Sequence, residues 1–108
     1  GAKAKMKYKK IFPVTVNTEM ESEKAIKSLQ EVLGVSSVMK NIPPSMGSED
    51  FSFMLEQRPG AYILLGAGGA SEGKMLHTTK YDFNDEILTL GASYWSTLVE
   101  NELQRNQE

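Results

Sequence analysis

A short apolar run, Ala61-Tyr62-Ile63-Leu64-Leu65, lies between two groups of residues that break regular structure. Arg58-Pro59-Gly60 precedes it, and a glycine-rich segment, residues 66–73, follows it. An uninterrupted apolar run of this length is typical of a strand that is covered on both faces. Strands of that kind occur in sheets that carry helices on each side, so this run favours an α/β fold.

Helical patterns precede this run. Thr18 and Glu21 match a capping box at the start of one helix, and Gly34 is expected to end that helix. Its apolar residues recur at helical spacing: Ala25, Ile26, Leu29, Val32 and Leu33. A shorter helix is expected to begin near Ser48 as its N-cap and to end at Arg58-Pro59-Gly60.

A third helix is expected after Asn84, a favourable N-cap residue, with Asp85 and Glu86 in its first turn. Its apolar stripe would extend over about five turns. The stripe consists of Ile87, Leu88, Gly91, Tyr94, Trp95, Leu98, Val99 and Leu103. The polar residues 104–108 are expected to fray.

Two more segments have strand character. Residues 3–10 alternate between lysines and other side chains, which is the period of a half-buried strand, and residues 35–39 could form a short strand. Residues 11–17 and 78–83 are expected to be extended connectors. The order strand, helix, strand, helix, strand, helix predicts an α/β fold: a β-α-β-α-β-α unit whose helices cover a mixed sheet.

The charge balance does not favour nucleic acid or an anionic membrane as a partner. The chain has 12 Lys and Arg, 14 Asp and Glu, and a formal net charge of −2. Five lysines lie in residues 1–10 and could bind a polyanion, but lysines commonly protect a sheet edge, and we favour that interpretation. No apolar run approaches the roughly 20 residues that span a bilayer. The lack of cysteine excludes disulfides and is compatible with a cytoplasmic location.

Three features could carry chemistry. His77 is the only histidine, and it could bind a metal or move a proton, although a lone histidine is more often a surface residue. Without a second histidine, a self-contained zinc site is not expected. Glu49 and Asp50 point about 100° apart on a helix, so they suit helix electrostatics or a cleft wall better than a facing acid/base pair. Gly66 and Gly68 could offer backbone amides to an anion at the end of a strand.

Several motifs together carry a family resemblance. They are Phe12-Pro13-Val14-Thr15-Val16-Asn17, Met46-Gly47-Ser48-Glu49-Asp50-Phe51, Pro59-Gly60-Ala61-Tyr62, Leu65-Gly66-Ala67-Gly68 and Leu76-His77-Thr78-Thr79-Lys80-Tyr81-Asp82-Phe83. In this order and spacing they resemble metal-dependent amidohydrolases of the hippurate hydrolase and N-acyl-amino-acid amidohydrolase type, within the aminoacylase/carboxypeptidase metallopeptidases. The resemblance covers nearly the whole chain but only the C-terminal portion of the family.

The resemblance implies a catalytic α/β domain with a two-metal site for Zn, Mn, Ni or Co, and an inserted lid domain that often mediates homodimerisation. Residues 1–10 would be the last strand of the lid, and residues 11–108 the C-terminal part of the catalytic domain. His77 would be a metal ligand. The residues expected to line the cleft are Ser48, Glu49 and Asp50, with Gly66 and Gly68 near the substrate carboxylate.

By the same resemblance, the complete protein would hydrolyse the amide bond of N-acyl amino acids or related peptide-like substrates with metal-activated water. The family's other metal ligands and its catalytic glutamate lie upstream of the matched part. We therefore expect no catalytic residue in these 108 residues, no metal bound by them alone, and no activity from them alone. The alternative is a stand-alone, non-catalytic α/β interaction domain.

Overall fold

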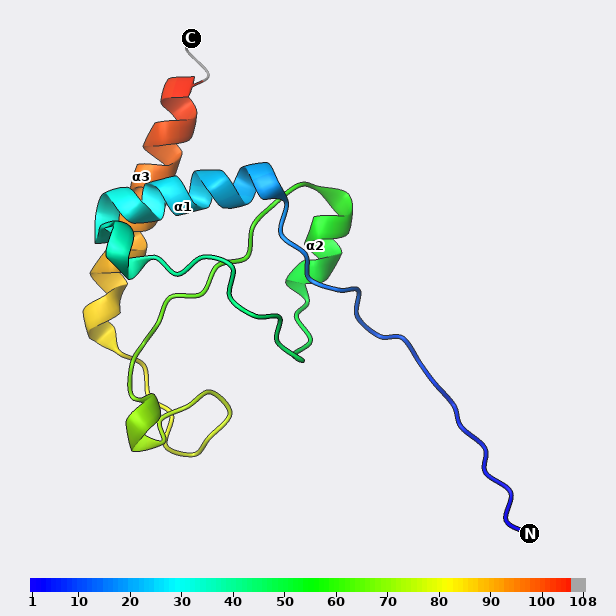
Figure 1. Ribbon diagram of the computed structural model, residues 1–108. Coiled ribbons are helices and arrows are strands. Elements are labelled where there is room, and N and C mark those ends of the chain that lie inside the picture. The colour runs from blue at the N-terminus through cyan, green and yellow to red at the C-terminus, as the bar shows by residue number, and fades with distance from the viewer. Residues whose placement is uncertain (106–108) are drawn as a thin grey trace.

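Three α-helices, joined by long extended segments, make up the computed structural model, which describes residues 1–105 (Figure 1). The helices are α1 (Glu19–Leu33), α2 (Phe51–Gln57) and α3 (Leu88–Arg105), and the short 3-10 turns are η1 (Val35–Ser37), η2 (Ala70–Glu72) and η3 (Asp85–Ile87). α1 packs across α3, and α2 lies near the opposite end of α1 (Figure 1). Among the described helices, none combines the length and the apolar character that a membrane span requires.

The predicted sheet is not present. No strand occurs within residues 1–105, so the prediction of an α/β fold with a β-α-β-α-β-α mixed sheet is wrong for this structure. Residues 3–10 and 61–65 are irregular rather than paired. The remaining predicted strand, residues 35–39, begins as the 3-10 turn η1. The hydrogen bonds of a strand join separate segments, so a strand-like pattern becomes a strand only where another strand lies beside it.

The first predicted helix is confirmed as α1, but its capping box is wrong. Thr18 makes no side-chain capping bond, and its Oγ1 instead accepts a hydrogen bond from the Gly60 amide at 3.1 Å. The Thr18 hydroxyl therefore bonds to Gly60, in a distant segment, and not to Glu21 as the capping box predicted. Gly34 ends the helix as predicted, at φ 81°, a backbone angle that glycine adopts without a Cβ penalty.

The starts of the other two helices differ in outcome. Ser48 is not the N-cap of α2: that position is Asp50, and its side chain makes no capping bond. Asn84 is confirmed as a cap, because its Oδ1 accepts a hydrogen bond from the Glu86 amide at 3.0 Å. Of residues 104–108, which were predicted to fray, Gln104 and Arg105 belong to α3, and residues 106–108 lie outside the described residues.

The core is small and lies between α1 and α3. Ala25 and Ser28 of α1 are 4% and 1% exposed, and Tyr94 of α3 is 5% exposed. The remainder of the α3 stripe is largely exposed, including Trp95, Val99 and Leu103. Only one part of this apolar face is therefore covered within the described residues.

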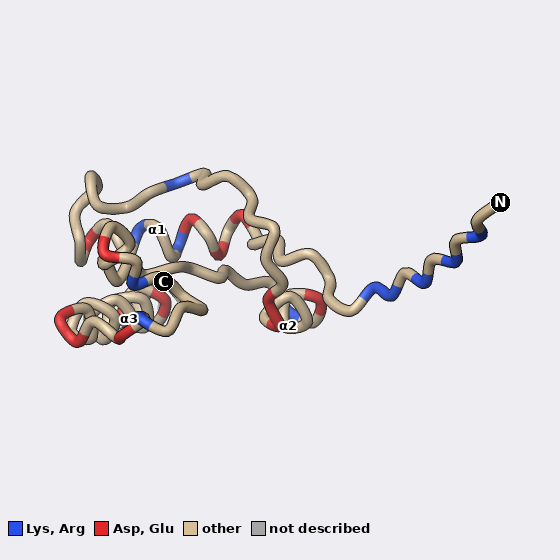
Figure 2. Tube along the Cα trace, turned by 90° about the horizontal axis from the view of Figure 1, so that it is seen from below, with Lys and Arg blue, Asp and Glu red and all other residues tan. Residues whose placement is uncertain are grey.

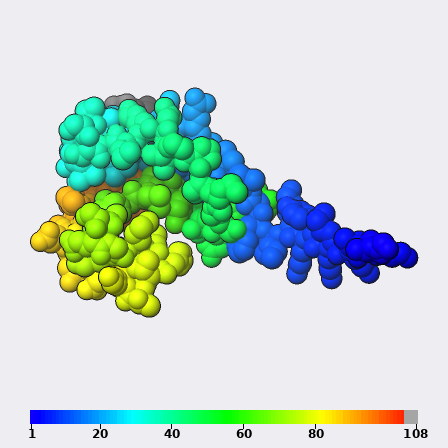
Figure 3. All heavy atoms as spheres, turned by 60° about the horizontal axis from the view of Figure 1, so that its bottom comes forward, coloured from blue at the N-terminus to red at the C-terminus, as the bar shows by residue number. Residues whose placement is uncertain are grey.

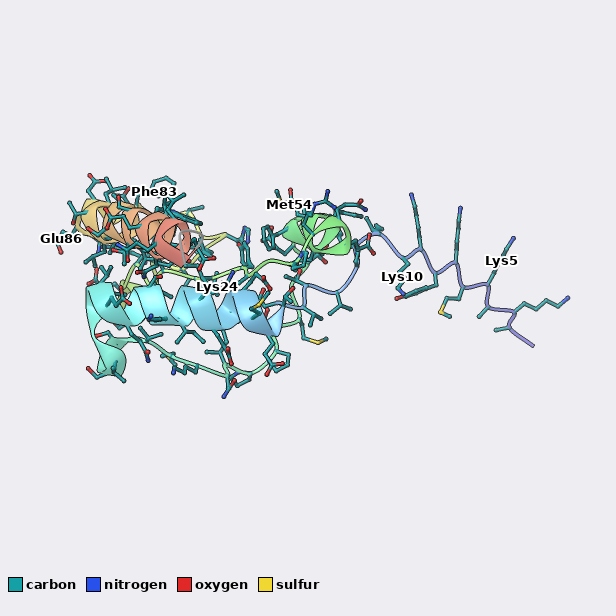
Figure 4. The ribbon with its side chains drawn as sticks, turned by 90° about the horizontal axis from the view of Figure 1, so that it is seen from above. Lys5, Lys10, Lys24, Met54, Phe83 and Glu86 are labelled. Carbon is teal, nitrogen blue, oxygen red and sulfur yellow. The ribbon has the colours of Figure 1, made fainter. Side chains whose placement is uncertain are left out.

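Polar contacts also join the two long helices. Asn101 Nδ2 donates to Ser28 Oγ at 3.1 Å and to Glu31 Oε2 at 3.0 Å. Lys24 forms an ion pair with Glu102 at 2.7 Å, and Figure 4 shows Lys24 on the side of α1 that faces α3. These contacts fix the crossing of α1 and α3 where little apolar area is buried.

The molecule is much more open than a compact domain. Its radius of gyration is 18.3 Å, whereas about 13 Å is typical for this length. Its accessible surface is 9672 Å², against about 6,000 Å² for a compact monomer of this mass. The N-terminal residues form an arm that extends away from the helices (Figure 3), and a row of basic residues lies along it (Figure 2). Lys5 and Lys10 lie along that arm in Figure 4.

Candidate functional site

The turn before α2 holds the acidic pair that was predicted to line a cleft. The backbone carbonyl of Glu49 accepts from the Ser52 hydroxyl at 2.7 Å and from the Ser52 amide at 3.2 Å, and Ser52 is 1% exposed. The Glu49 carboxylate accepts a long hydrogen bond, 3.4 Å, from the Phe51 amide. Glu49 is half-buried, whereas Ser48 and Asp50 are exposed. The buried serine therefore anchors the turn, and Glu49 is the member of the pair that the fold holds.

Tyr62 contacts this turn from the segment that follows α2. Hydrogen bonding from Asp50, then from the Tyr62 hydroxyl and the Phe51 amide, lowers the pKa of Glu49 from its ordinary value. Hydrogen bonding with Glu49 in turn raises the pKa of Tyr62. The Asp50 carboxyl group can donate a hydrogen bond only while it is protonated. The Tyr62 hydroxyl and the Phe51 amide can donate whether or not Asp50 carries a proton. The Tyr62 ring also lies 5.4 Å from that of Phe51, between ring centroids.

The glycine-rich segment is a closed turn. Gly68 and Gly69 have φ of 73° and 75°, which explains the need for glycine at both positions. The Gly69 carbonyl accepts from the amides of Glu72 and Lys74, each at 3.0 Å. Gly66 and Gly68 are exposed. Their role near a substrate carboxylate stays a prediction.

His77 lies at the tip of the next turn. It is exposed and has φ 63°, a left-handed conformation that is uncommon outside glycine. The turn is held by Thr78, whose hydroxyl donates to the Met75 carbonyl at 2.8 Å and whose amide donates to the same oxygen at 3.2 Å. Non-glycine residues in this region cluster at functional sites, but the ligand role of His77 rests on the resemblance alone.

The residues that could bind a metal ion are scattered over the described part of the chain. Across residues 1–105, no group of three or more His, Cys, Asp or Glu side chains is placed to hold a metal ion. A stable zinc site needs three or four protein or water ligands in a fixed geometry, and one exposed imidazole does not supply them. The donor set is therefore incomplete, and no catalytic step can be assigned to it here.

The structure joins some of the predicted residues and separates others. Glu49 and Asp50 lie in the turn before α2, whereas His77 lies in a different turn, after η2. Sequence reasoning missed Tyr62 and Asn17, whose side-chain amide hydrogen-bonds to both backbone groups of Tyr62. Both residues belong to the motifs that carried the resemblance, but one was assigned to a connector and the other to a strand.

An open groove of about 620 Å³ lies between the N-terminal connector and α2. Residues 10–14 and Val16 form one wall, and Phe53 and Leu55 belong to the other. The rings of Phe12 and Phe53 are 5.6 Å apart there, between centroids. The groove is lined by neither His77 nor Glu49, so it is not part of the predicted cleft.

Comparison with known families gives one match. The model of peptidase family M20/M25/M40 matches residues 3–101. The chain belongs to this family. The M20 assignment confirms the resemblance to metal-dependent amidohydrolases, since it rests on almost the whole chain.

Several curated relatives support the M20 assignment. The chain is 34% identical over 90 residues to hippurate hydrolase of Campylobacter jejuni, covering 82% of this chain and 22% of that protein. It is 30% identical over 95 residues to thermostable carboxypeptidase 2 of Saccharolobus solfataricus (85% and 23%). It is 32% identical over 89 residues to IAA-amino acid hydrolase ILR1-like 2 of Arabidopsis thaliana (82% and 20%). No solved structure matches the chain.

The M20 chain spans about a fifth to a quarter of the length of these relatives. All three carry names of hydrolases or carboxypeptidases, so the family is one of enzymes that cleave amide bonds.

Proposed function

We propose that this chain is the C-terminal portion of a metal-dependent amidohydrolase that acts on N-acyl amino acids or related peptide-like substrates. The observation that carries the proposal is the 34% identity to a hippurate hydrolase over 82% of the chain, within a family match to residues 3–101. Hippurate is an N-acyl amino acid, and the Arabidopsis relative is named for amino acid conjugates. The shared chemistry is an acyl group joined to an amino acid by an amide bond.

His77 would supply one imidazole to a two-metal site, with the remaining ligands outside these residues. Zn, Mn, Ni and Co are the candidate ions. When bound, such a metal pair would supply a polarised carbonyl and an activated water. Within this chain, Glu49 and Asp50 would form one wall of the cleft, and the exposed amides near Gly66 and Gly68 would face the substrate carboxylate.

The chain by itself is proposed to be inactive. Lid-mediated homodimerisation of the complete protein and its cytoplasmic location remain proposals, and neither nucleic acid nor a membrane is proposed as a partner. The N-terminal arm, with its five lysines, is proposed as part of the lid rather than as a polyanion site.

The test compares the purified chain with the full-length protein that contains it. We expect hydrolysis of N-benzoyl and N-acetyl amino acids by the full-length protein with Zn²⁺ or Mn²⁺, and none by the chain alone. Loss of a metal ligand in His77→Ala should lower kcat/KM by at least about 100-fold, since even supporting residues of metal sites cost about 10–100-fold.

His77→Asn is the matched variant, because asparagine tolerates a left-handed backbone and should preserve the turn. Both variants should bind less metal than wild type by elemental analysis. Hydrolysis by the isolated chain would contradict the incomplete site. A full-length protein that is metal-free and inactive on every N-acyl amino acid would favour the interaction-domain alternative.

A further inference from the structure

The side chain of Asn84 joins the glycine-rich segment to the start of α3. Its Oδ1 accepts a hydrogen bond from the Glu86 amide at 3.0 Å, which caps η3. Its Nδ2 donates to the backbone carbonyl of Ala67 at 3.1 Å. A side-chain amide can make both bonds because it carries an acceptor and a donor on one planar group. Asn84 and Ala67 are both half-buried, and the segment lies beside the start of α3 in Figure 1.

A second contact holds the same segment against α3. A Cβ added to Gly91 would lie 3.7 Å from Leu65 Cδ2, so the backbone of α3 passes close to Leu65. Leu65 lies two residues before Ala67. The segment therefore touches the helix and its cap at two places, which limits how far the backbone between and just after them can move.

The bond from Asn84 also sets the direction of the next backbone amide. The carbonyl of Ala67 and the amide of Gly68 belong to one planar peptide group, and in a trans peptide they point in opposite directions. When Asn84 holds the carbonyl, the Gly68 amide must point away from Asn84. The carbonyl of Gly69 is held as well, because it accepts from two amides of its own turn, each at 3.0 Å.

The Gly68 amide is the group that this arrangement leaves available. It has no hydrogen-bond acceptor within residues 1–105, and Gly68 is exposed. A Cβ added at Gly66 or at Gly68 would meet no atom within 4 Å, so open space lies beside both residues. An exposed amide whose direction is fixed in advance can donate to an anion at a smaller cost in conformational entropy.

We propose that Asn84 is a positioning residue that directs the Gly68 amide toward the carboxylate of the substrate. The role of the carboxylate rests on the proposed function, which places Gly66 and Gly68 near that group. The attachment of the segment to Asn84 does not rest on it. Asn84 acts through the peptide group of Ala67 and does not touch the substrate. Its loss should therefore weaken binding of a carboxylate more than it slows the chemical step.

The test uses Asn84→Ser in the full-length protein that contains this chain. Serine still caps a helix, but its shorter side chain cannot also donate to Ala67. With N-benzoylglycine, KM should rise about tenfold, the scale of one hydrogen bond to a charged group, and kcat should change by less than about twofold. With N-benzoylglycinamide, which has no carboxylate, wild type and variant should have equal kcat/KM or, if turnover is slow, equal inhibition constants.

Gly34→Ala is the matched control for lost stability. Gly34 ends α1 at φ 81°, where alanine is strained, and a Cβ there would meet no atom within 4 Å. This variant should unfold more easily and keep the wild-type preference for N-benzoylglycine over its amide. An equal loss on both compounds in Asn84→Ser would indicate a general structural defect and would overturn the positioning role. An unchanged KM for N-benzoylglycine would overturn it too.

Hydrogen exchange of the full-length protein tests the attachment separately. The amides of residues 72–74 close the turn around Gly69, and in Asn84→Ser they should exchange faster than in wild type. Gly34→Ala should leave them unchanged. Wild-type exchange in Asn84→Ser would contradict the attachment. A full-length protein that hydrolyses no N-acyl amino acid but shows this faster exchange would overturn the proposed function, and the carboxylate role with it, and would support the attachment.

Discussion

Left-handed backbone at single residues marks the turns of this molecule. Within residues 1–105, Asn41 and His77 are the non-glycine residues with positive φ, at 54° and 63°. Asparagine and histidine are both enriched in this region, and asparagine can bond locally to its own backbone. His77 can therefore be replaced by asparagine to remove the imidazole while the turn is kept, which separates loss of a ligand from loss of the loop.

Glu49 links stability to pH through its lowered pKa. Its ordinary pKa is 4.5, and hydrogen bonds from Asp50, Tyr62 and the Phe51 amide place the folded-state pKa below this value. A carboxyl group with a depressed folded-state pKa stabilises the fold above its unfolded pKa, and this contribution is lost as the pH falls through the folded-state pKa. The turn before α2 should accordingly loosen on acidification below about pH 4.5, and less so in Tyr62→Phe.

The side-chain cap at Asn84 was predicted and is observed, and a substitution of Asn84 tests what it contributes to stability. Its Oδ1 accepts from the Glu86 amide at 3.0 Å, and its Nδ2 donates to the Ala67 carbonyl at 3.1 Å. Asn84→Ala should lower the free energy of unfolding by about 1 kcal/mol or more, because the cap is lost together with the link to the glycine-rich loop. Urea unfolding followed at 222 nm measures this change.

Asn84→Ser separates the two contributions, because serine can cap the helix but cannot donate to Ala67 as the amide does. Its free energy of unfolding should lie between those of wild type and Asn84→Ala. Equal stability of all three proteins would show that the cap does not support α3.

At the scale of elements, helices formed where they were predicted and strands did not. α1 and α3 bury part of one face against each other, and α2 is short but tied to residues 60–62. The segments 3–10 and 61–65 remain irregular. An α-helix satisfies its own backbone groups, whereas an extended segment depends on a neighbour, which Asn17 supplies for Tyr62 alone.

Two glycines of different conformation should respond oppositely to alanine. Gly91 lies inside α3, and an added Cβ would meet Leu65 Cδ2 at 3.7 Å, an ordinary contact. Gly91→Ala should therefore raise the free energy of unfolding by up to about 1 kcal/mol. Gly69 has φ 75° and would place a Cβ 3.1 Å from Lys74 Cβ, so Gly69→Ala should destabilise its turn.

Thermal unfolding of the two variants beside wild type makes the comparison. Gly91→Ala should unfold at a higher temperature, and Gly69→Ala should alter the amide signals of residues 68–74. A lower unfolding temperature for Gly91→Ala would mean that the contact between α3 and Leu65 is tighter than the structure shows.

At the scale of the whole molecule, apolar side chains lie on the surface in numbers that a monomer rarely tolerates. Val14, Leu64 and Phe83 are 78%, 71% and 79% exposed, and the radius of gyration of 18.3 Å is that of an open chain. Sheet segments without partners present the same problem for backbone groups. In the proposed complete enzyme, these apolar side chains would be covered by the part that corresponds to the remaining three-quarters of the relatives' length.

The isolated chain should therefore self-associate. Sedimentation velocity should give a weight-average mass above 12.0 kDa that rises with protein concentration. Leu64→Lys should weaken this association, because it places a charge on an exposed apolar segment. Ser71→Lys, the same charge in an exposed turn, should have little effect. A single 12.0 kDa species at the highest concentration would contradict the prediction.

The sequence by itself determined the helices, the cap at Asn84, the stop at Gly34 and the M20 family. Each depends on local hydrogen bonds or on motifs that can be read along the chain. Only the tertiary structure decided that the extended segments form no sheet within residues 1–105, that Thr18 bonds to Gly60 rather than Glu21, and that Tyr62 is joined to Asn17. These outcomes depend on segments more than forty residues apart for the two pairs, whose approach no local pattern encodes.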